Sequence, residues 1–94
     1  MARTFTFSVD NVGNPEPVTA QGPCRKIIVR EQGAAATTDY FVRQPTATSP
    51  QVRKVAGEST LFDAGEGNLS QTGQIVGYVE TVTGTVTFSQ EEME

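Results

Sequence analysis

The sequence predicts a single all-β domain over residues 1–94: an antiparallel β-sandwich or small barrel, with jelly-roll connectivity as one possible arrangement. Valine, isoleucine and threonine, which favour strands, recur along the chain, whereas leucine occurs only at Leu61 and Leu69. Roughly seven or eight short apolar runs alternate with glycine- and proline-rich stretches about ten residues apart. A chain of 94 residues has room for one hydrophobic core.

The first strand is predicted over residues 4–11, where Phe5, Phe7 and Val9 alternate with polar residues and would cover one face. Proline and glycine then predict a loop that leads to a short extended piece at 18–20. The densest apolar run is Ile27, Ile28 and Val29, which predicts a central strand over 24–31. Cys24, at the start of this strand, is predicted to be a buried structural thiol.

The middle of the chain predicts further short strands separated by surface loops. The strands are expected at 39–44, 51–55 and 59–63, and the loops at 32–39, 45–50 and 64–73. In the first of these strands Tyr40 and Val42 lie opposite Phe41 and Arg43.

The last two strands are predicted as a hairpin, with strands 74–82 and 85–89 joined by Thr83 and Gly84. Gly77, inside the first of them, indicates a β-bulge or a close approach of another group to the backbone. The acidic residues 90–94 are expected to form a loose tail, or to pair with a basic surface on a neighbouring molecule.

Charge is unevenly distributed along the sequence. The first 54 residues carry seven bases and four acids, a net charge of +3, and the remaining 40 carry seven acids and no base, a net charge of −7. This polarity suits contacts between subunits by complementary charge. The alternative is that strands from the two halves interleave in the fold and mix the signs.

The composition argues against several classes of function. Without histidine the chain lacks the commonest general base and metal ligand, and one cysteine can form neither a disulfide within the chain nor a thiolate zinc site. We therefore expect no enzyme activity, no cofactor and no metal. A pI of about 4.7 argues against nucleic acid, and no apolar run is long enough for a signal peptide or a membrane span.

From Cys24 onward four segments follow one another: CRKIIVRE, TTDYFVRQPT, VRKVAGESTLF and GQIVGYVETVTGTVTFSQEE. With this order of segments the chain resembles small accessory proteins of tailed-bacteriophage virions, the head decoration or cement class. This resemblance implies a non-enzymatic β-sandwich that is made in the host cytoplasm and joins the virion. It also implies binding to the major capsid protein or other virion proteins, and self-association as a homotrimer or another homo-oligomer.

Candidate partner-contact residues follow from expected exposure and charge. They are Arg3, Phe5 and Phe7 of an extended N-terminal strand (1–11), the basic residues Arg25, Lys26, Arg43, Arg53 and Lys54, and the tail residues Glu91, Glu92 and Glu94. The N-terminal strand could add to a neighbour's sheet edge. The alternative function is a carbohydrate- or receptor-binding module of a tail or fibre, with Tyr40, Phe41 and Tyr78 as candidate sugar contacts. A small carboxylate enzyme is a third, weaker hypothesis.

Overall fold

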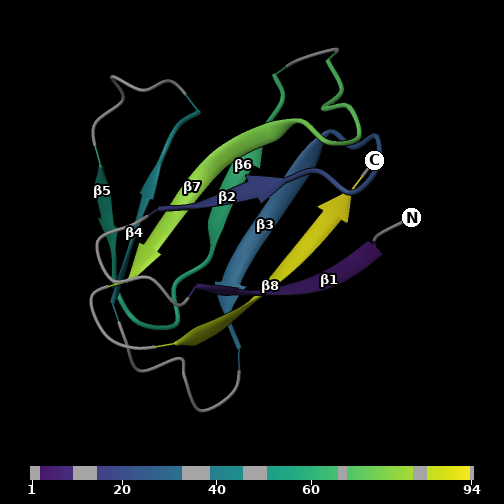
Figure 1. Ribbon diagram of the computed structural model, residues 1–94. Helices are drawn as coiled ribbons and strands as arrows, with labels where there is room; N and C mark the ends of the chain where they lie inside the picture. Colours follow the sequence, from purple (N-terminus) through teal and green to yellow (C-terminus); the bar gives the residue numbers. More distant parts are fainter. Residues whose placement is uncertain are drawn as a thin grey trace.

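The computed structural model describes residues 3–9, 15–32, 39–45, 51–65, 68–81 and 85–93, which form an all-β fold as predicted (Figure 1). The strands are β1 (Arg3–Val9), β2 (Glu16–Thr19), β3 (Lys26–Glu31), β4 (Tyr40–Arg43), β5 (Val52–Lys54), β6 (Thr60–Asp63), β7 (Ile75–Thr81) and β8 (Val86–Met93).

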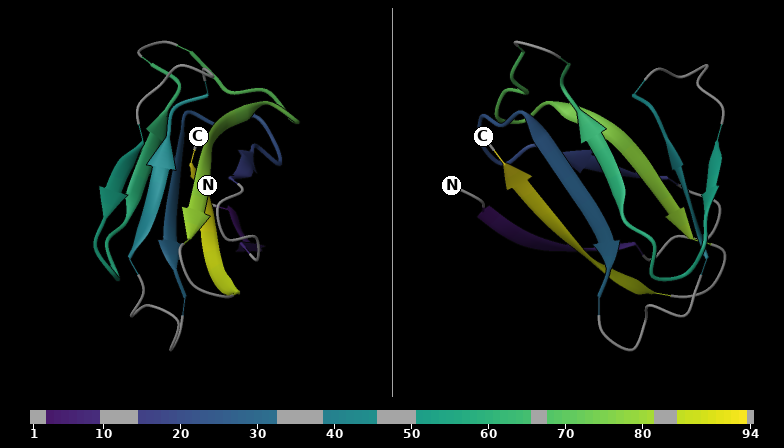
Figure 2. Two further views of the ribbon diagram at one scale, coloured as in Figure 1. Left: turned by 60° about the vertical axis from the view of Figure 1, so that its left-hand side comes forward. Right: turned by 180° about the vertical axis from the view of Figure 1, so that it is seen from behind.

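The strands form two four-stranded antiparallel sheets that pack face to face as a β-sandwich (Figure 2). Sheet A has the order β1-β8-β3-β6, and sheet B has the order β2-β7-β4-β5. Strands far apart in sequence are therefore neighbours. β1 pairs with β8 over its whole length, from Arg3 opposite Glu92 to Val9 opposite Val86.

The predicted hairpin of the last two strands is wrong, because β7 and β8 lie in different sheets. β7 is flanked by β2 and β4, and β8 is flanked by β1 and β3, so each is a central strand whose two edges are both occupied. A short glycine-containing connection between two alternating runs also suits a chain that crosses from one sheet to the other. Thr83 and Gly84 themselves lie outside the described residues.

The predicted loose tail is also wrong over residues 90–93, because β8 continues to Met93 between β1 and β3. Its side chains alternate without interruption, and Phe88, Gln90 and Glu92 all point inward. The two inward polar side chains are accommodated by hydrogen bonds, described below. Glu94 lies outside the described residues.

Aromatic side chains occupy the centre of the core between the sheets. Phe88 is fully buried, with its ring stacked on Phe7 at a centroid separation of 5.5 Å and edge-on to Tyr40 at 5.1 Å. The fully buried Tyr40 donates its hydroxyl to the carbonyl of Glu58. Cys24 is buried as predicted, just before β3. Val9, Val18, Ala20, Ile27, Val29, Val42, Phe62, Val76, Val79 and Val86 complete the cluster.

Gly77 shows both a bulge and a close approach, as its place inside a strand predicted. Val18 pairs with Gly77 but the next residue of β2, Thr19, pairs with Ile75, so β7 has one extra residue at this point. A Cβ atom at Gly77 would lie 2.3 Å from Cε1 of Phe62. The absence of a side chain therefore lets the Phe62 ring of sheet A pack directly on the backbone of β7.

The two charged halves of the sequence interleave in space. In sheet A, strands of the basic half (β1 and β3) alternate with strands of the acidic half (β8 and β6). In sheet B, β7 comes from the acidic half and the other three strands from the basic half. The alternative of mixed signs therefore holds for sheet A, and a simple division of the molecule into a basic and an acidic end does not follow from the fold.

Candidate functional site

A groove of about 710 Å³ lies on the outer face of sheet A. Alternation fixes which side chains reach it: on β3 the flanking Ile27 and Val29 face the core, so Ile28 faces outward. By the same rule Thr4 of β1 and Glu91 of β8 point into the groove. The floor of the groove is thus made by three neighbouring strands, and their ladder holds its side chains in fixed register.

The register brings unlike groups together on this floor. Glu91 lies opposite Thr4 on one side and Ile28 on the other, while Ser89 lies opposite Arg30. Arg30 and Glu91 are therefore at diagonal positions on adjacent strands, within reach of a common bound group. A cation, a carboxylate, hydroxyls and one apolar contact are available at this surface.

A tight turn forms one wall of the groove. The amide of Glu58 donates to the carbonyl of Val55 at 3.0 Å, and Gly57 within this turn has a positive φ of 84° that favours glycine. The amide of Gly57 donates to the buried carboxylate of Glu31 at 3.4 Å, which ties the turn to the end of β3. Ser59 and Gln32 complete this wall.

The groove has the volume of a ligand site but not its usual lining. Small-molecule sites of roughly 300–1,000 Å³ are mostly apolar. Here Ile28 is the one apolar side chain among the described lining residues, and the rest are polar or charged except Gly57. Such a lining suits hydrogen bonding to a polar partner surface better than enclosure of an apolar molecule.

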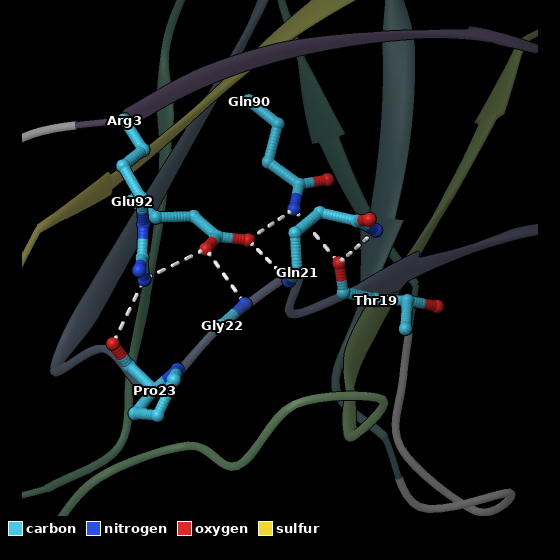
Figure 3. A network of polar contacts seen from close by, with 7 residues as sticks. All are labelled: Arg3, Thr19, Gln21, Gly22, Pro23, Gln90 and Glu92. Carbon is cyan, nitrogen blue, oxygen red and sulfur yellow. Dashed lines mark hydrogen bonds and ion pairs between the residues drawn. The ribbon is translucent and has the colours of Figure 1, made fainter.

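Behind the groove, Glu92 forms a buried polar clamp (Figure 3). Its side chain is fully buried, and its two carboxylate oxygens accept hydrogen bonds from four donors. One oxygen accepts from the amide of Gln21 at 2.6 Å and from Nε2 of Gln90 at 2.8 Å. The other accepts from the amide of Gly22 at 3.2 Å and from Nη2 of Arg3 at 3.3 Å, which is also an ion pair.

The clamp joins the two sheets along one side of the sandwich. Arg3 also donates to the carbonyl of Pro23 at 2.9 Å, and Gln90 donates to the carbonyl of Thr19 at 2.8 Å. A Cβ atom at Gly22 would lie 2.7 Å from Nη1 of Arg3, so glycine leaves the space that the guanidinium occupies. The segment that follows β2 is thereby attached to β1 and β8, two of the three strands that form the groove floor.

Cys24, beside the clamp, and Asp39, beside the turn at Gly57, have shifted pKa values. Burial, reinforced by the negative charge of Glu92 and opposed by Arg3, raises the pKa of the Cys24 thiol. The pKa of Asp39 is lowered, first by the hydrogen bond from Arg53 and then by the amide of Ala56.

The N-terminal residues predicted as partner contacts are not a free arm. Phe5 and Phe7 are half-buried on the inner face of β1, and Phe7 stacks on Phe88. Arg3 is bound to Glu92, and Glu92 itself has no exposed surface, so its assignment as a surface contact is wrong. β1 pairs with β8 over its whole length and forms one edge of sheet A, so the prediction that it adds to a neighbour's sheet edge stays a prediction.

The predicted basic group is divided between the two sheets. Arg25 and Lys26 are exposed at the start of β3 in sheet A, whereas Arg43, Arg53 and Lys54 belong to β4 and β5 in sheet B. Two of these cations are paired locally: Arg53 with Asp39, and Lys54 with Glu58 at 3.6 Å between Nζ and Oε2. The structure therefore does not gather these residues into one basic patch.

Of the predicted contact residues, Glu91 alone lies in the groove among those described. Arg30, Ser89 and Thr4 were not among them. Their outward direction follows from strand alternation, but their nearness to one another depends on β8 lying between β1 and β3. No pattern within a single segment contains that information.

The aromatic side chains considered for sugar binding separate into two environments. Tyr40 lies in the core, whereas Phe41 and Tyr78 are half-buried on the outer face of sheet B. Phe41 pairs with Glu80, and Tyr78 pairs with Arg43, so the two rings are diagonal neighbours on adjacent strands.

Comparisons with known proteins add no identity: no family model, no curated protein and no solved structure matches this chain. Within the described ranges, no group of three or more histidine, cysteine, aspartate or glutamate residues is placed to hold a metal ion. Nor do the described residues include a helix long and apolar enough to cross a membrane.

Proposed function

We propose that the protein is a non-enzymatic assembly protein that docks on a protein surface, specifically a decoration or cement protein of a tailed-phage virion made in the host cytoplasm. The observation that carries the proposal is the groove on sheet A, where Arg30, Glu91 and hydroxyl groups are displayed on three rigid strands. The sequence resemblance supplies the virion and the major capsid protein as partner. The groove supplies the contact surface.

The strand order supports this assignment. β1 pairs with β8, β2 with β7, β3 with β6 and β4 with β5, which is the pairing made when one long hairpin folds over on itself. We infer that the sandwich has jelly-roll connectivity. Viral capsid proteins and lectins contain jelly rolls, so by analogy of fold this connectivity favours a binding function.

A polar groove of this kind binds by complementary hydrogen bonds and charges. Arg30 can donate two parallel hydrogen bonds to a carboxylate of the partner, and Glu91 can accept hydrogen bonds from a cation or from amide groups. Both side chains stand on paired strands, so the backbone that carries them is already ordered and binding has only the side chains left to fix. Ile28 and its neighbour Leu61, which is 51% exposed, give the contact an apolar portion.

The test is binding of the purified protein to heads of its phage that lack it, measured by co-sedimentation. Arg30→Glu reverses the charge inside the groove, and we expect binding to weaken about tenfold or more, since like charges at an interface cost several kcal/mol. Arg25→Glu makes the same change at an exposed residue outside the groove lining and should bind like the wild type. Wild-type protein that does not sediment with heads, or equal binding by both variants, would overturn the proposal.

A second candidate function is carbohydrate binding on sheet B. It is favoured by the diagonal pair Phe41 and Tyr78 on the outer face, beside Arg43. Aromatic rings on a sheet face are suited to stack on sugar rings. A glycan array is the test: hits that are lost in Phe41→Ala and Tyr78→Ala support this function, and an array without hits removes it.

A further inference from the structure

The four sheet edges differ in how they are protected against pairing with another chain. β2 contains Pro17 and lies at the bulge with β7, and both features disturb a regular edge. β5 has three residues, two of them the cations Arg53 and Lys54. β6 has four residues and ends at Asp63. Short length, charge, proline and bulges are the usual means by which proteins block edge pairing.

β1 has none of these protective features over most of its length. All seven residues pair with β8 without a register shift, and the stretch from Thr4 to Val9 contains no charge, proline or glycine. Its one charged residue, Arg3, is bound to Glu92. Within the described part of the chain, the main chain of β1 forms no hydrogen bond outside its ladder with β8. Figures 1 and 2 show β1 as the outermost strand of sheet A.

We propose that β1 pairs antiparallel with β1 of a second copy of this chain. The two A sheets then form one continuous sheet of eight strands about a two-fold axis that passes midway between the two copies of Thr6. In this register Thr6 lies opposite itself, Thr4 opposite Ser8, and Phe5 opposite Phe7 of the second copy. The contact is isologous, so the same edge supplies both partners and the assembly closes as a dimer.

A second copy is the occupant because the edge is complementary to itself. On the outer face, pairing β1 with β1 places hydroxyl side chains opposite hydroxyl side chains. On the inner face it places the half-buried Phe5 of one copy beside Phe7 of the other, which buries more of both rings. No like charges oppose each other. Self-pairing of β5 would instead bring Arg53 and Lys54 against a second copy of themselves.

The dimer goes beyond the proposed docking function, because it concerns the protein free of any partner. A two-fold axis perpendicular to the joined sheet leaves both outer faces on the same side. The two grooves then face one direction and can bind a repetitive surface together, which raises the overall affinity by linkage. Groove variants and edge variants affect different residues, so the two proposals fail independently.

The test is the molar mass in solution, measured by light scattering after size exclusion over a range of concentrations. The wild type is expected at twice the chain mass of 10.1 kDa. Thr6→Lys and Thr6→Glu place like charges next to the axis at an exposed side chain, and each should raise the dimer dissociation constant at least about fivefold, since like charges at an interface cost several kcal/mol. An equimolar mixture of these two variants should restore the dimer, and Thr72→Lys, an exposed change away from β1, should leave it unchanged.

The mixing experiment separates loss of pairing from loss of folding, because a misfolded variant cannot be rescued by its charge complement. A wild type that stays monomeric at all concentrations overturns the proposal, and so does a trimer, because a two-fold contact between identical edges closes at two copies. A dimer that neither Thr6 variant weakens would place the contact elsewhere and would equally overturn it.

Discussion

Replacing Glu92 with glutamine tests whether the buried clamp holds the sandwich together. The carboxylate has two equivalent oxygens, each of which accepts two hydrogen bonds: Gln21 and Gln90 on one, Gly22 and Arg3 on the other. An amide has one oxygen and one nitrogen. Whichever way the glutamine side chain turns, its nitrogen faces two donors, and both lose their acceptor.

The size of the effect follows from which donors can return to water. Arg3 is 36% exposed and can be rehydrated in part, whereas the amide of Gly22 is buried. A buried donor without a partner costs about 1–3 kcal/mol, and a lost hydrogen bond to a charged group adds to this, so Glu92→Gln should reduce the free energy of unfolding by about 2–4 kcal/mol. In a domain of this size that lowers Tm by roughly 10–30 °C.

Thermal and urea unfolding followed by circular dichroism measure this loss directly. Glu91→Gln is the matched control, because it makes the same chemical change one residue earlier on the outward face and should stay within about 0.5 kcal/mol of the wild type. Equal stability of the two variants would refute the role of the clamp.

Three further predictions concern packing and titration. Gly77→Ala should lose about 1–3 kcal/mol of stability, because its Cβ would lie 2.3 Å from the Phe62 ring; unchanged urea unfolding would show that the ring moves freely. The lowered pKa of Asp39 stabilises the fold above the usual value of 3.8, and this contribution is lost as the pH falls through the lower folded pKa. Asp39→Asn should therefore flatten the acid limb of a Tm-against-pH curve, and an unchanged limb would contradict the Arg53 pairing. The raised pKa of Cys24 stabilises the fold fully below its usual value of 9.0, and the contribution is lost as the pH rises through the higher folded pKa. Cys24→Ala should therefore lessen alkaline destabilisation, and native protein alkylated as fast as unfolded protein would contradict the burial of the thiol.

Local patterns predicted the strands well because the pattern that indicates a strand is contained in residues adjacent in the sequence. The alternation of Phe5, Phe7 and Val9 gives the inner face of β1, and the apolar run at Ile27 gives β3. The same reasoning predicted the burial of Cys24 and the special role of Gly77. In each case the signal that predicts the feature lies within the segment, even where the contact that it makes, such as Phe62 on Gly77, comes from another strand.

Strand pairing was predicted less well because it depends on contacts across the chain. A two-residue gap suggested a hairpin, but β7 pairs with β2 and β4 in sheet B and β8 pairs with β1 and β3 in sheet A. Glu92 looked like an exposed tail residue, since nothing near it in the sequence indicates that the amides of Gln21 and Gly22 donate hydrogen bonds to it in the interior. The groove was missed for the same reason: Arg30 and Glu91 meet only through the strand order.

Quantitative mass spectrometry of purified, intact phage heads tests the proposed virion role most directly. We predict that the chain is in the particle fraction at a constant ratio to the major capsid protein. If the chain is absent from purified particles and stays in the soluble fraction of the lysate, the virion role is contradicted.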